Sequence, residues 1–322
     1  MPRVARLLMF SLVVAFLLAC VAALRGDLAQ LSLAPLRHSW DLVVLAAVLS
    51  LGNYAFRVVR WRAYLIRLGH WLPAGFTALT YLSGFAFTLS PGKMGEMARA
   101  RYYAEAGIPV ADIAGAFFVE RLMDCVAMVV LAAAILTAVP HYSVIIWVTL
   151  AAVGSVLFML AVYPWSALHR RLDQPAQPGM RAPTGVGRFL RAVVRALSAS
   201  RNLLRLEVLI SGLCLSLIAW GLEGIGLFVI GGLFQTVQLD IPVAVGIYAV
   251  AVMAGAVSFL PGGLGTTEAV MTALLVAQGY QLPEAILITV ACRLVTLWLA
   301  VGIGWVSVLI LRQRNLTAAL PW

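Results

Sequence analysis

The residues best suited to chemistry lie in two charged stretches that interrupt otherwise apolar sequence. The first stretch, residues 89–128, contains Lys93, Glu96, Arg99, Arg101, Glu120, Arg121 and Asp124. The second, residues 260–299, contains Glu268 and Arg293. A planar guanidinium group matches the geometry of phosphate oxygens, and a carboxylate can hold such a cation in place. These residue types therefore indicate a site that binds an anion such as phosphate.

The two stretches also share their spacing. Glu96 precedes Arg121 by 25 positions, and Glu268 precedes Arg293 by 25. Each glutamate follows a turn motif, made of Pro91, Gly92 and Gly95 in the first stretch and of Pro261, Gly262, Gly263 and Gly265 in the second. Matched spacings of this kind indicate an internal structural repeat, which many transport proteins have. We expect repeat one to cover about 41–138 and repeat two about 207–311.

Each turn motif also predicts a backbone site for anions. Proline and glycine interrupt the helix and leave backbone groups unpaired, which is tolerated at membrane depth only inside protein or beside a wet cavity. The helix after each turn presents N–H groups and a positive dipole end. Arg121 and Arg293 lie about nine residues into the next long helices, roughly 13 Å from their starts. A charge at that depth costs at least ~2.5 kcal/mol, which favours a functional role.

Two roles remain open for these arginines. Glu96 can pair with Arg121, and Glu268 with Arg293, so that each pair ties a turn to its long helix. Alternatively, the arginines contact a ligand directly, and the two roles are compatible because a paired arginine keeps spare donors. Glu120 and Asp124 lie within one helical turn of Arg121 and can hold it as well.

Other charged residues also have two interpretations. Lys93, Arg99 and Arg101 either contact a lipid headgroup or are ordinary cytoplasmic positive charge. Glu223 lies in a glycine-rich apolar segment, where it is either an arginine partner or a carboxylate that couples transport to protons.

Composition sets the class of protein. The 322-residue chain has 63% hydrophobic and 11% charged residues, whereas soluble domains have roughly 25% charged residues. Its apolar runs are continuous, which predicts a polytopic α-helical membrane protein and excludes a β-barrel. The formal charge of +10 does not indicate nucleic-acid binding, because the arginines lie in loops beside apolar segments. No metal-binding cluster, nucleotide motif or catalytic signature is visible, so we expect no metal, no cofactor and no enzyme activity.

Six apolar segments are expected to span the membrane fully: 7–24, 41–59, 112–138, 143–163, 207–234 and 284–311. The first could instead be a signal peptide ending near Cys20, but it is longer than a usual signal core. Four shorter helices are expected around the turns, at 74–90, 95–106, 243–260 and 266–279. The linker 165–205 carries eight arginines, and it is either a solvated basic loop or partly a helix on anionic lipid.

The distribution of arginines predicts the topology. Arg57, Arg60, Arg62 and Arg67 lie at the end of the segment 41–59 and just after it, and they indicate a cytoplasmic loop. If 74–90 crossed the membrane, the arginine-rich linker would lie outside, whereas a re-entrant hairpin at 74–106 places it inside. We therefore predict an all-α protein with about six full transmembrane helices and two re-entrant hairpins, arranged as an inverted repeat whose tips meet near the midplane. Both termini would be cytoplasmic and the protein would lie in a bacterial inner membrane.

These motifs also carry a family resemblance. The pattern Pro91-Gly92-x-x-Gly95-Glu96-x-x-Arg99, followed by Glu120-Arg121-x-x-Asp124, resembles the transmembrane region of lysylphosphatidylglycerol synthases, which are flippase-like membrane proteins. The second turn, with Glu268 and Arg293, is similar to the family's second motif, and the resemblance covers roughly 40–311. It implies a lipid-translocating membrane domain. In full-length synthases a soluble aminoacyl-transferring domain follows; this chain ends at Trp322, so lysyl transfer from tRNA is not expected.

Three functions are compatible with these observations. The first is a transporter of an anionic or phosphate-bearing lipid, passive or ion-coupled, with Glu223, Glu120 or Asp124 as proton carriers. Its expected substrate-binding residues are Arg121, Arg293, Glu96, Glu268, Lys93, Arg99, Glu120 and Asp124. The second is a non-transporting partner that presents lipid to a lipid, hopanoid or glycan biosynthetic enzyme. The third, an intramembrane enzyme acting on a prenyl-phosphate lipid, is the weakest because no nucleophile or acidic metal cluster is evident.

Overall fold

The computed structural model describes residues 38–135, 201–234 and 237–314, together with single positions between 148 and 162. Every regular element among these residues is a helix, as predicted. The expected span at 7–24, nearly all of the span at 143–163, most of the basic linker and both termini lie outside the described residues.

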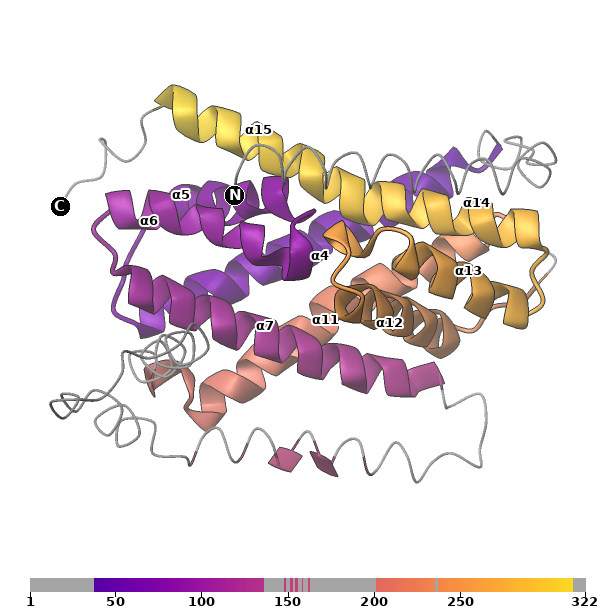
Figure 1. The fold of residues 1–322 in the computed structure, drawn as a ribbon, viewed down its shortest axis with the longest axis horizontal. Coiled ribbons are helices and arrows are strands. Elements are labelled where there is room, and N and C mark those ends of the chain that lie inside the picture. The colour runs from indigo at the N-terminus through magenta and orange to yellow at the C-terminus, as the bar shows by residue number, and fades with distance from the viewer. Residues whose placement is uncertain are drawn as a thin grey trace, which may run out of the picture.

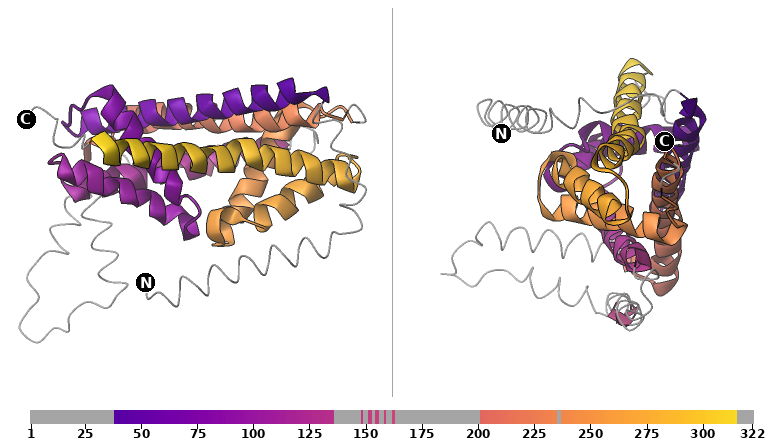
Figure 2. Two further views of the ribbon diagram at one scale, coloured as in Figure 1. Left: turned by 90° about the horizontal axis from the view of Figure 1, so that it is seen from above. Right: turned by 90° about the vertical axis from the view of Figure 1, so that its right-hand side faces the viewer.

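Three helices in the described part of the chain are long and apolar enough to cross a membrane. They are α4 (Trp40–Arg67), α11 (Leu206–Gly231) and the continuous helix Leu282–Gln313. At 1.5 Å per residue, helices of 26 to 32 residues exceed the roughly 30 Å of a bilayer's apolar core. Figure 2 shows that all three run along the long axis of the molecule. The prediction of a helical membrane protein is therefore confirmed.

The last of these helices has three parts: α14 (Leu282–Arg293), the π-helical turn η7 (Leu294–Trp298) and α15 (Leu299–Arg314). Its first part packs on α13, where the Thr272 hydroxyl donates to the Thr289 hydroxyl at 3.1 Å. Its last part packs so closely on the first hairpin that a Cβ on Gly304 would overlap the backbone of Ala86. One helix therefore lies against elements from both halves of the chain.

Two helical hairpins complete the described fold. The first consists of α5 (Ala74–Ser83), η1 (Gly84–Phe87), η2 (Pro91–Arg99) and α6 (Ala100–Glu105). The second consists of α12 (Ile241–Val257), η6 (Pro261–Gly263) and α13 (Thr266–Ala277). Figures 1 and 2 show them approaching from opposite ends of the long axis, so that their tips meet in the middle of the molecule.

Glycine is required at both tips. A Cβ on Gly95 would lie 2.6 Å from the Ser90 hydroxyl oxygen and 2.7 Å from the Phe87 carbonyl oxygen. Gly262 has a φ of 62°, a conformation that costs other residues roughly 1–2 kcal/mol. A Cβ on Gly262 would also lie 2.7 Å from the Leu89 side chain, which belongs to the other tip. The tips are therefore in direct contact, as the repeat predicts.

Each hairpin is followed by a helix that carries one of the predicted arginines. Helix α7 (Val110–Ala133) follows the first hairpin, and α14 follows the second. Arg121 and Arg293 each lie 11 positions after the first residue of their helix. Both helices begin about two residues earlier than expected, since Pro109 and Gln281 have extended backbone just before them.

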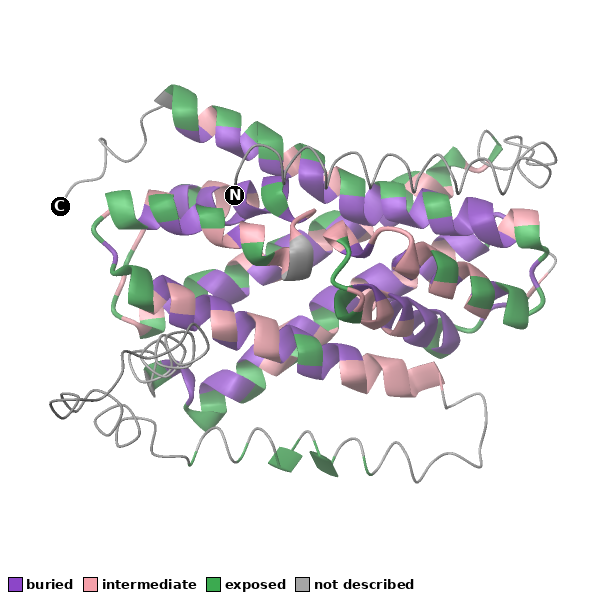
Figure 3. Ribbon diagram, in the orientation of Figure 1, coloured by how far each residue is buried: buried purple, intermediate pink, exposed green. Residues whose placement is uncertain are grey.

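Whether a residue is buried depends on where the helices pack together, and not on whether its side chain is apolar or polar. Figure 3 shows buried positions where helices face one another and exposed positions along their outer faces. The outer faces carry large apolar side chains, among them Val48, Val59, Ile210, Trp298 and Leu309. Eight arginine and carboxylate side chains of the described residues, in contrast, lie inside the bundle. A surface of apolar side chains around a charged interior is the arrangement expected of a protein in lipid.

Candidate functional site

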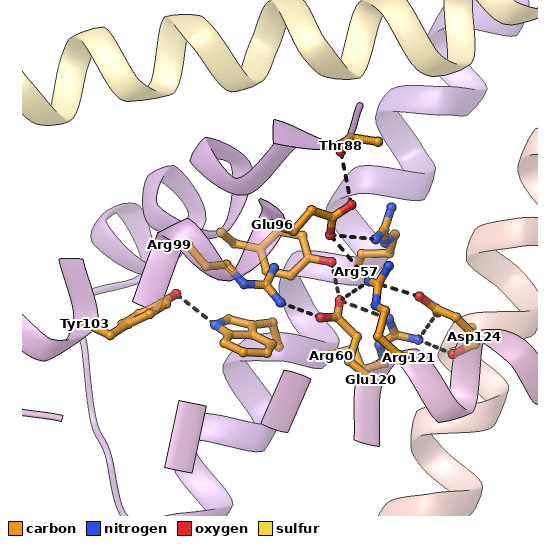
Figure 4. Close-up of polar contacts among 12 residues, drawn as sticks. Arg57, Arg60, Thr88, Glu96, Arg99, Tyr103, Glu120, Arg121 and Asp124 are labelled. Atoms are coloured by element: carbon orange, nitrogen blue, oxygen red, sulfur yellow. Dashed lines mark hydrogen bonds and ion pairs between the residues drawn. The ribbon is translucent and has the colours of Figure 1, made fainter. Parts of the chain in front are cut away.

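Four arginines and three carboxylates meet beneath the first hairpin (Figure 4). We call this group the charged cluster. Its members are Arg57 and Arg60 of α4, Glu96 and Arg99 of η2, and Glu120, Arg121 and Asp124 of α7. Six members are buried, while the Arg121 side chain keeps 20% of its surface exposed. Because unpaired buried charges are very costly, the cluster constrains all three elements at once.

Glu120 lies at the centre of the charged cluster and is fully buried. It accepts a hydrogen bond from Arg99 at 2.5 Å and one from Arg60 at 3.2 Å. The hydroxyl of Tyr81 on α5 also donates to this carboxylate, and Arg121 Nη2 lies 3.3 Å from it. One carboxylate therefore joins α4, α5, η2 and α7.

Asp124 holds the opposite side of Arg60. Its Oδ1 accepts from Arg60 Nη1 at 2.7 Å, and its Oδ2 lies 3.1 Å from Arg121 Nη2. Arg60 Nη1 also donates to the hydroxyl of Ser216 on α11. Arg60 thus connects α4 with both α7 and α11, and its charge is balanced within the protein.

Glu96 ties the tip of the first hairpin to α7, as the sequence predicts. Its Oε2 lies 3.6 Å from Arg121 Nη2 and 3.9 Å from Arg57 Nη2. Its Oε1 accepts a hydrogen bond from the Thr88 hydroxyl at 3.0 Å. The pairing of Glu96 with Arg121 is therefore present, although Arg57 shares it.

Sequence reasoning missed the two arginines of α4. The prediction that Arg57 and Arg60 mark a cytoplasmic loop at the end of the segment 41–59 is wrong, because α4 continues to Arg67. Burial of both shows that they are interior residues rather than loop charge. A helical signal was available, because Asn53, Arg57, Arg60 and Tyr64 are spaced three or four apart and lie on one buried face.

The second hairpin has a simpler arrangement. Arg293 Nε donates to Glu268 at 2.6 Å, which is the predicted pair, and its Nη2 donates to the Gly262 carbonyl at 2.9 Å. Glu268 also accepts from the Gly265 N–H at 2.6 Å. The backbone N–H expected to bind an anion at this tip is therefore occupied by the protein's own carboxylate.

The three basic residues of the first hairpin have different environments. Arg99 is fully buried, with its guanidinium carbon 3.9 Å from the centre of the Trp61 ring, and it belongs to the charged cluster. Arg101 is exposed and pairs with Glu105 at 2.9 Å on the same helical face. Lys93 is half-buried at the tip and has a φ of 57°. Since left-handed backbone is unfavourable for lysine, surrounding contacts must hold Lys93 in place.

Positive charge exceeds negative charge around the first tip. Four guanidinium groups of the charged cluster face three carboxylates, and Lys93 adds a further cation. Several buried N–H groups also have no hydrogen-bond acceptor among the described residues. They are Arg57 Nε and Nη2, Arg60 Nε, Arg99 Nε and Nη1, Arg121 Nε and Nη2, and Trp220 Nε1. Glu96 Oε2 and Asp124 Oδ2 are also buried without a hydrogen-bond donor, and they form ion pairs with Arg57 Nη2 and Arg121 Nη2. Buried donors normally have acceptors, so the other nitrogens are the surplus that points to an anion.

Two of these residues, Arg57 of α4 and Trp220 of α11, lie together with Lys93 at the Trp220 ring, and we call Arg57, Lys93 and Trp220 the donor site. The Arg57 guanidinium carbon lies 5.3 Å from the centre of the Trp220 ring, and Lys93 Nζ lies 5.1 Å from it. Phe85 covers the Arg57 guanidinium at 4.9 Å. Arginine, lysine and tryptophan side chains donate hydrogen bonds and accept none. The chemistry of the donor site therefore matches a ligand with several acceptor oxygens and negative charge.

Glu223 lies one helical turn beyond Trp220 and is buried, with 3% of its surface exposed. The Ser50 hydroxyl of α4 donates to its Oε2 at 2.9 Å. No arginine or lysine nitrogen of the described chain lies within 4.0 Å of this carboxylate. Of the two interpretations of Glu223, the structure thus gives it a hydroxyl contact rather than an arginine partner.

Comparison with known proteins identifies the family. Residues 4–304 match the model of the lysylphosphatidylglycerol synthase TM region. The chain belongs to this family. A UPF0104 membrane protein of Methanothermobacter thermautotrophicus is 27% identical over 291 residues, which cover 81% of this chain and 83% of that protein. This relative is described only as a membrane protein.

The lysylphosphatidylglycerol synthase TM match includes both hairpins, the charged cluster and the donor site. The family match therefore covers every element that contributes a side chain to the site. In the described chain, no three His, Cys, Asp or Glu side chains are placed to hold a metal ion. The polar chemistry available here is hydrogen-bond donation from cations, together with a few buried carboxylates.

Proposed function

We propose that this protein moves an anionic, phosphate-bearing lipid between the two leaflets of a membrane and holds the headgroup beside the hairpin tips. The donor site carries the proposal. Arg57 Nε and Trp220 Nε1 are buried N–H groups without acceptors, and the Lys93 ammonium group lies over the same Trp220 ring as Arg57, so an acceptor-rich anionic ligand suits all three. A phosphate oxygen cluster meets that requirement better than a neutral headgroup does.

Arg121 supports the same headgroup position. Its side chain is held by Glu96, Glu120 and Asp124 but keeps 20% of its surface exposed. A guanidinium oriented by carboxylates loses less conformational entropy when a ligand binds. In this proposal Arg121 is a positioned donor at the edge of the charged cluster, while Arg293, whose Nε and Nη2 donate to Glu268 and Gly262, acts chiefly as a clamp.

Helix length supports re-entrant hairpins. The apolar helices of the two hairpins, Ala74–Phe87 and Ile241–Val257, have 14 and 17 residues, which correspond to roughly 21–26 Å and are shorter than the roughly 30 Å of a bilayer's apolar core. We propose that the hairpins enter from opposite faces and that six other helices cross fully, including two at 7–24 and 143–163. The positive-inside rule then places both termini on the cytoplasmic side of a bacterial inner membrane. Such an inverted arrangement places the tips, and so the headgroup, near the midplane.

The lipid tails remain outside the protein in this scheme. Large apolar side chains at the two tips are exposed, among them Phe87, Met94, Val257, Phe259 and Leu260. Exposed apolar side chains beside a donor-rich interior suit a molecule with one charged end and long hydrocarbon chains. The headgroup would therefore enter the protein sideways while its tails stay in the bilayer.

Mass spectrometry of lipids retained by the purified protein tests this proposal. Trp220→Phe keeps an aromatic ring but removes the N–H, and Lys93→Met keeps the side-chain length but removes the charge. We expect a phosphate-bearing lipid enriched in the wild type and reduced several-fold in both variants. Arg101→Met is the matched control, because Arg101 is an exposed cation of the same hairpin. Equal lipid content in all four proteins would contradict the proposal.

A reconstituted assay separates transport from lipid presentation. Proteoliposomes containing a fluorescent phospholipid report movement between leaflets when the outer label is quenched chemically. We expect the purified protein alone to move the lipid, and Trp220→Phe to slow this movement. Lipid retention without movement would instead support the non-transporting partner of a biosynthetic enzyme.

A further inference from the structure

Glu223 and the donor site occupy one place in the protein. Glu223 and Trp220 are three positions apart on α11 and therefore lie on the same helical face. The cations that act most strongly on the Glu223 carboxylate are Arg57, Lys93 and Arg293. Two of these three belong to the donor site. An anion at the donor site and a charged Glu223 would therefore compete for the same positive charge.

The other titratable neighbours of Glu223 are all neutral groups near pH 7. They come from α4, α12 and α14, and they are Tyr54, Tyr248 and Cys292. The Ser50 hydroxyl adds one hydrogen bond but no charge. A buried carboxylate without an ion pair is costly to keep charged, and the usual outcome is uptake of a proton. Glu223 therefore has no ion pair of its own in the described chain, unlike Glu96, whose Oε2 lies 3.9 Å from Arg57 Nη2 and 3.6 Å from Arg121 Nη2.

We propose that Glu223 takes up one proton when the donor site binds its anionic headgroup, so that lipid and proton move together. This inference rests on the proposed function, because it assumes an anionic headgroup at the donor site. The step itself is simple: the carboxylate gains a proton from water, and no other covalent bond changes. The headgroup replaces the negative charge lost at Glu223, so the charge that faces Arg57 and Lys93 stays constant.

Thermodynamic linkage gives the expected signature. If proton binding strengthens anion binding, then anion binding must strengthen proton binding by the same factor. Affinity for the anion should therefore rise as pH falls, by up to about tenfold per pH unit for one coupled proton. A proton gradient across the membrane would then drive the lipid in the direction of proton entry.

Binding of a short-chain phosphatidylglycerol to the purified full-length protein tests the inference. A phosphodiester keeps a single charge across the tested range, unlike a phosphomonoester, whose second pKa is about 6, so any pH dependence comes from the protein. We expect wild-type affinity to increase from about pH 7.5 to about pH 5, a range in which Lys93 is largely charged, with uptake of up to one proton per lipid in weak buffer. Glu223→Gln mimics the protonated state and should bind tightly throughout this range without proton uptake.

Two further variants distinguish coupling from a general structural effect. Ser50→Ala removes the hydrogen bond to the charged form of Glu223, so the pH profile should move toward higher pH while the tightest affinity stays the same. Glu207→Gln, an exposed glutamate at the start of the same helix, should keep the wild-type profile. If Glu223 only stabilised the fold, these two variants would not give this pair of results.

The outcomes separate this inference from the proposed function. Lipid binding and transport that are independent of pH, or a pH slope that survives in Glu223→Gln, would overturn proton coupling and leave lipid transport standing. Absence of any phospholipid binding or movement in the wild type would overturn both.

Discussion

The two hairpins contain matching turn motifs, but different numbers of side chains hold them. At the first tip, seven charged side chains from α4, η2 and α7 form the charged cluster. At the second, Arg293 binds Glu268 and one backbone carbonyl. The arginine of each half lies at the same position in its helix. The two halves thus share the same placement of helix and arginine. In the described structure, only the first hairpin has additional charged side chains around this arginine.

The source of the added charge explains the difference. Helix α4 contributes Arg57 and Arg60 to the first hairpin, whereas its contact near the second half is made by Tyr54, which donates to the Thr296 carbonyl at 2.6 Å. The first tip consequently has hydrogen-bond donors without acceptors, whereas at the second tip Arg293 and Glu268 bind each other. We therefore propose the anion site at the first tip, while the second tip has a structural clamp.

Breaking the centre of the charged cluster should have the largest effect. Glu120→Gln removes the charge that balances Arg60 and Arg99, and we expect a loss of about 3–5 kcal/mol in the free energy of unfolding. Denaturation in mixed detergent micelles measures it. Glu105→Gln, at an exposed pair of the same hairpin, is the control. Similar losses in the two variants would remove the distinction between an interior network and surface charge.

Breaking the clamp of the second hairpin should have a smaller effect. Glu268→Gln weakens one charge-assisted hydrogen bond and the cap at Gly265, so we expect a loss of about 1–3 kcal/mol. A double-mutant cycle with Arg293→Met, measured in the same micelles, isolates the pair. If its coupling energy exceeds that of Arg60 with Asp124, the second hairpin is the more strongly held one, contrary to the comparison above.

The smallest expected effect concerns backbone strain at the two hairpin tips. Each hairpin has one non-glycine residue with positive φ, Lys93 at 57° and Phe259 at 54°. Replacing either with glycine relieves that strain at an entropic cost, so we expect both variants to gain about 0.5–1 kcal/mol. Thermal unfolding measures the gain, and lipid mass spectrometry should show a loss of bound lipid in Lys93→Gly alone. Equal lipid loss in Phe259→Gly would place the ligand at both tips.

Much of the scaffold could be predicted from the sequence. Proline and glycine interrupt apolar runs at both tips, and the boundaries of the hairpin helices follow from them within a few residues. The matched spacing of glutamate and arginine also predicts both ion pairs, which the structure contains. These predictions are correct because each depends on local sequence or on a repeated spacing. The number of full spans and the membrane orientation of the hairpins stay predictions.

The composition of the site could not be predicted in the same way. Arg57 resembles any cytoplasmic arginine after an apolar run, and only the continuation of α4 to Arg67 makes it interior. Trp220 carries no sequence signal, since one tryptophan in an apolar helix usually fills space. Its role depends on which side chains α4 and η2 bring to the same ring. Contacts between elements far apart in the chain are what a single sequence conceals.

The continuous helix Leu282–Gln313 has a mechanical consequence. Its first half is fastened to the second hairpin through Arg293 and Glu268, and its last half lies against the first hairpin at Gly304. An α-helix resists stretching, so displacement of one hairpin along this rod is transmitted to the other. The π-helical turn η7 lies between the two attachments and is the natural point for bending. The two hairpins are therefore mechanically linked through this one helix, and a movement of either is expected to displace the other.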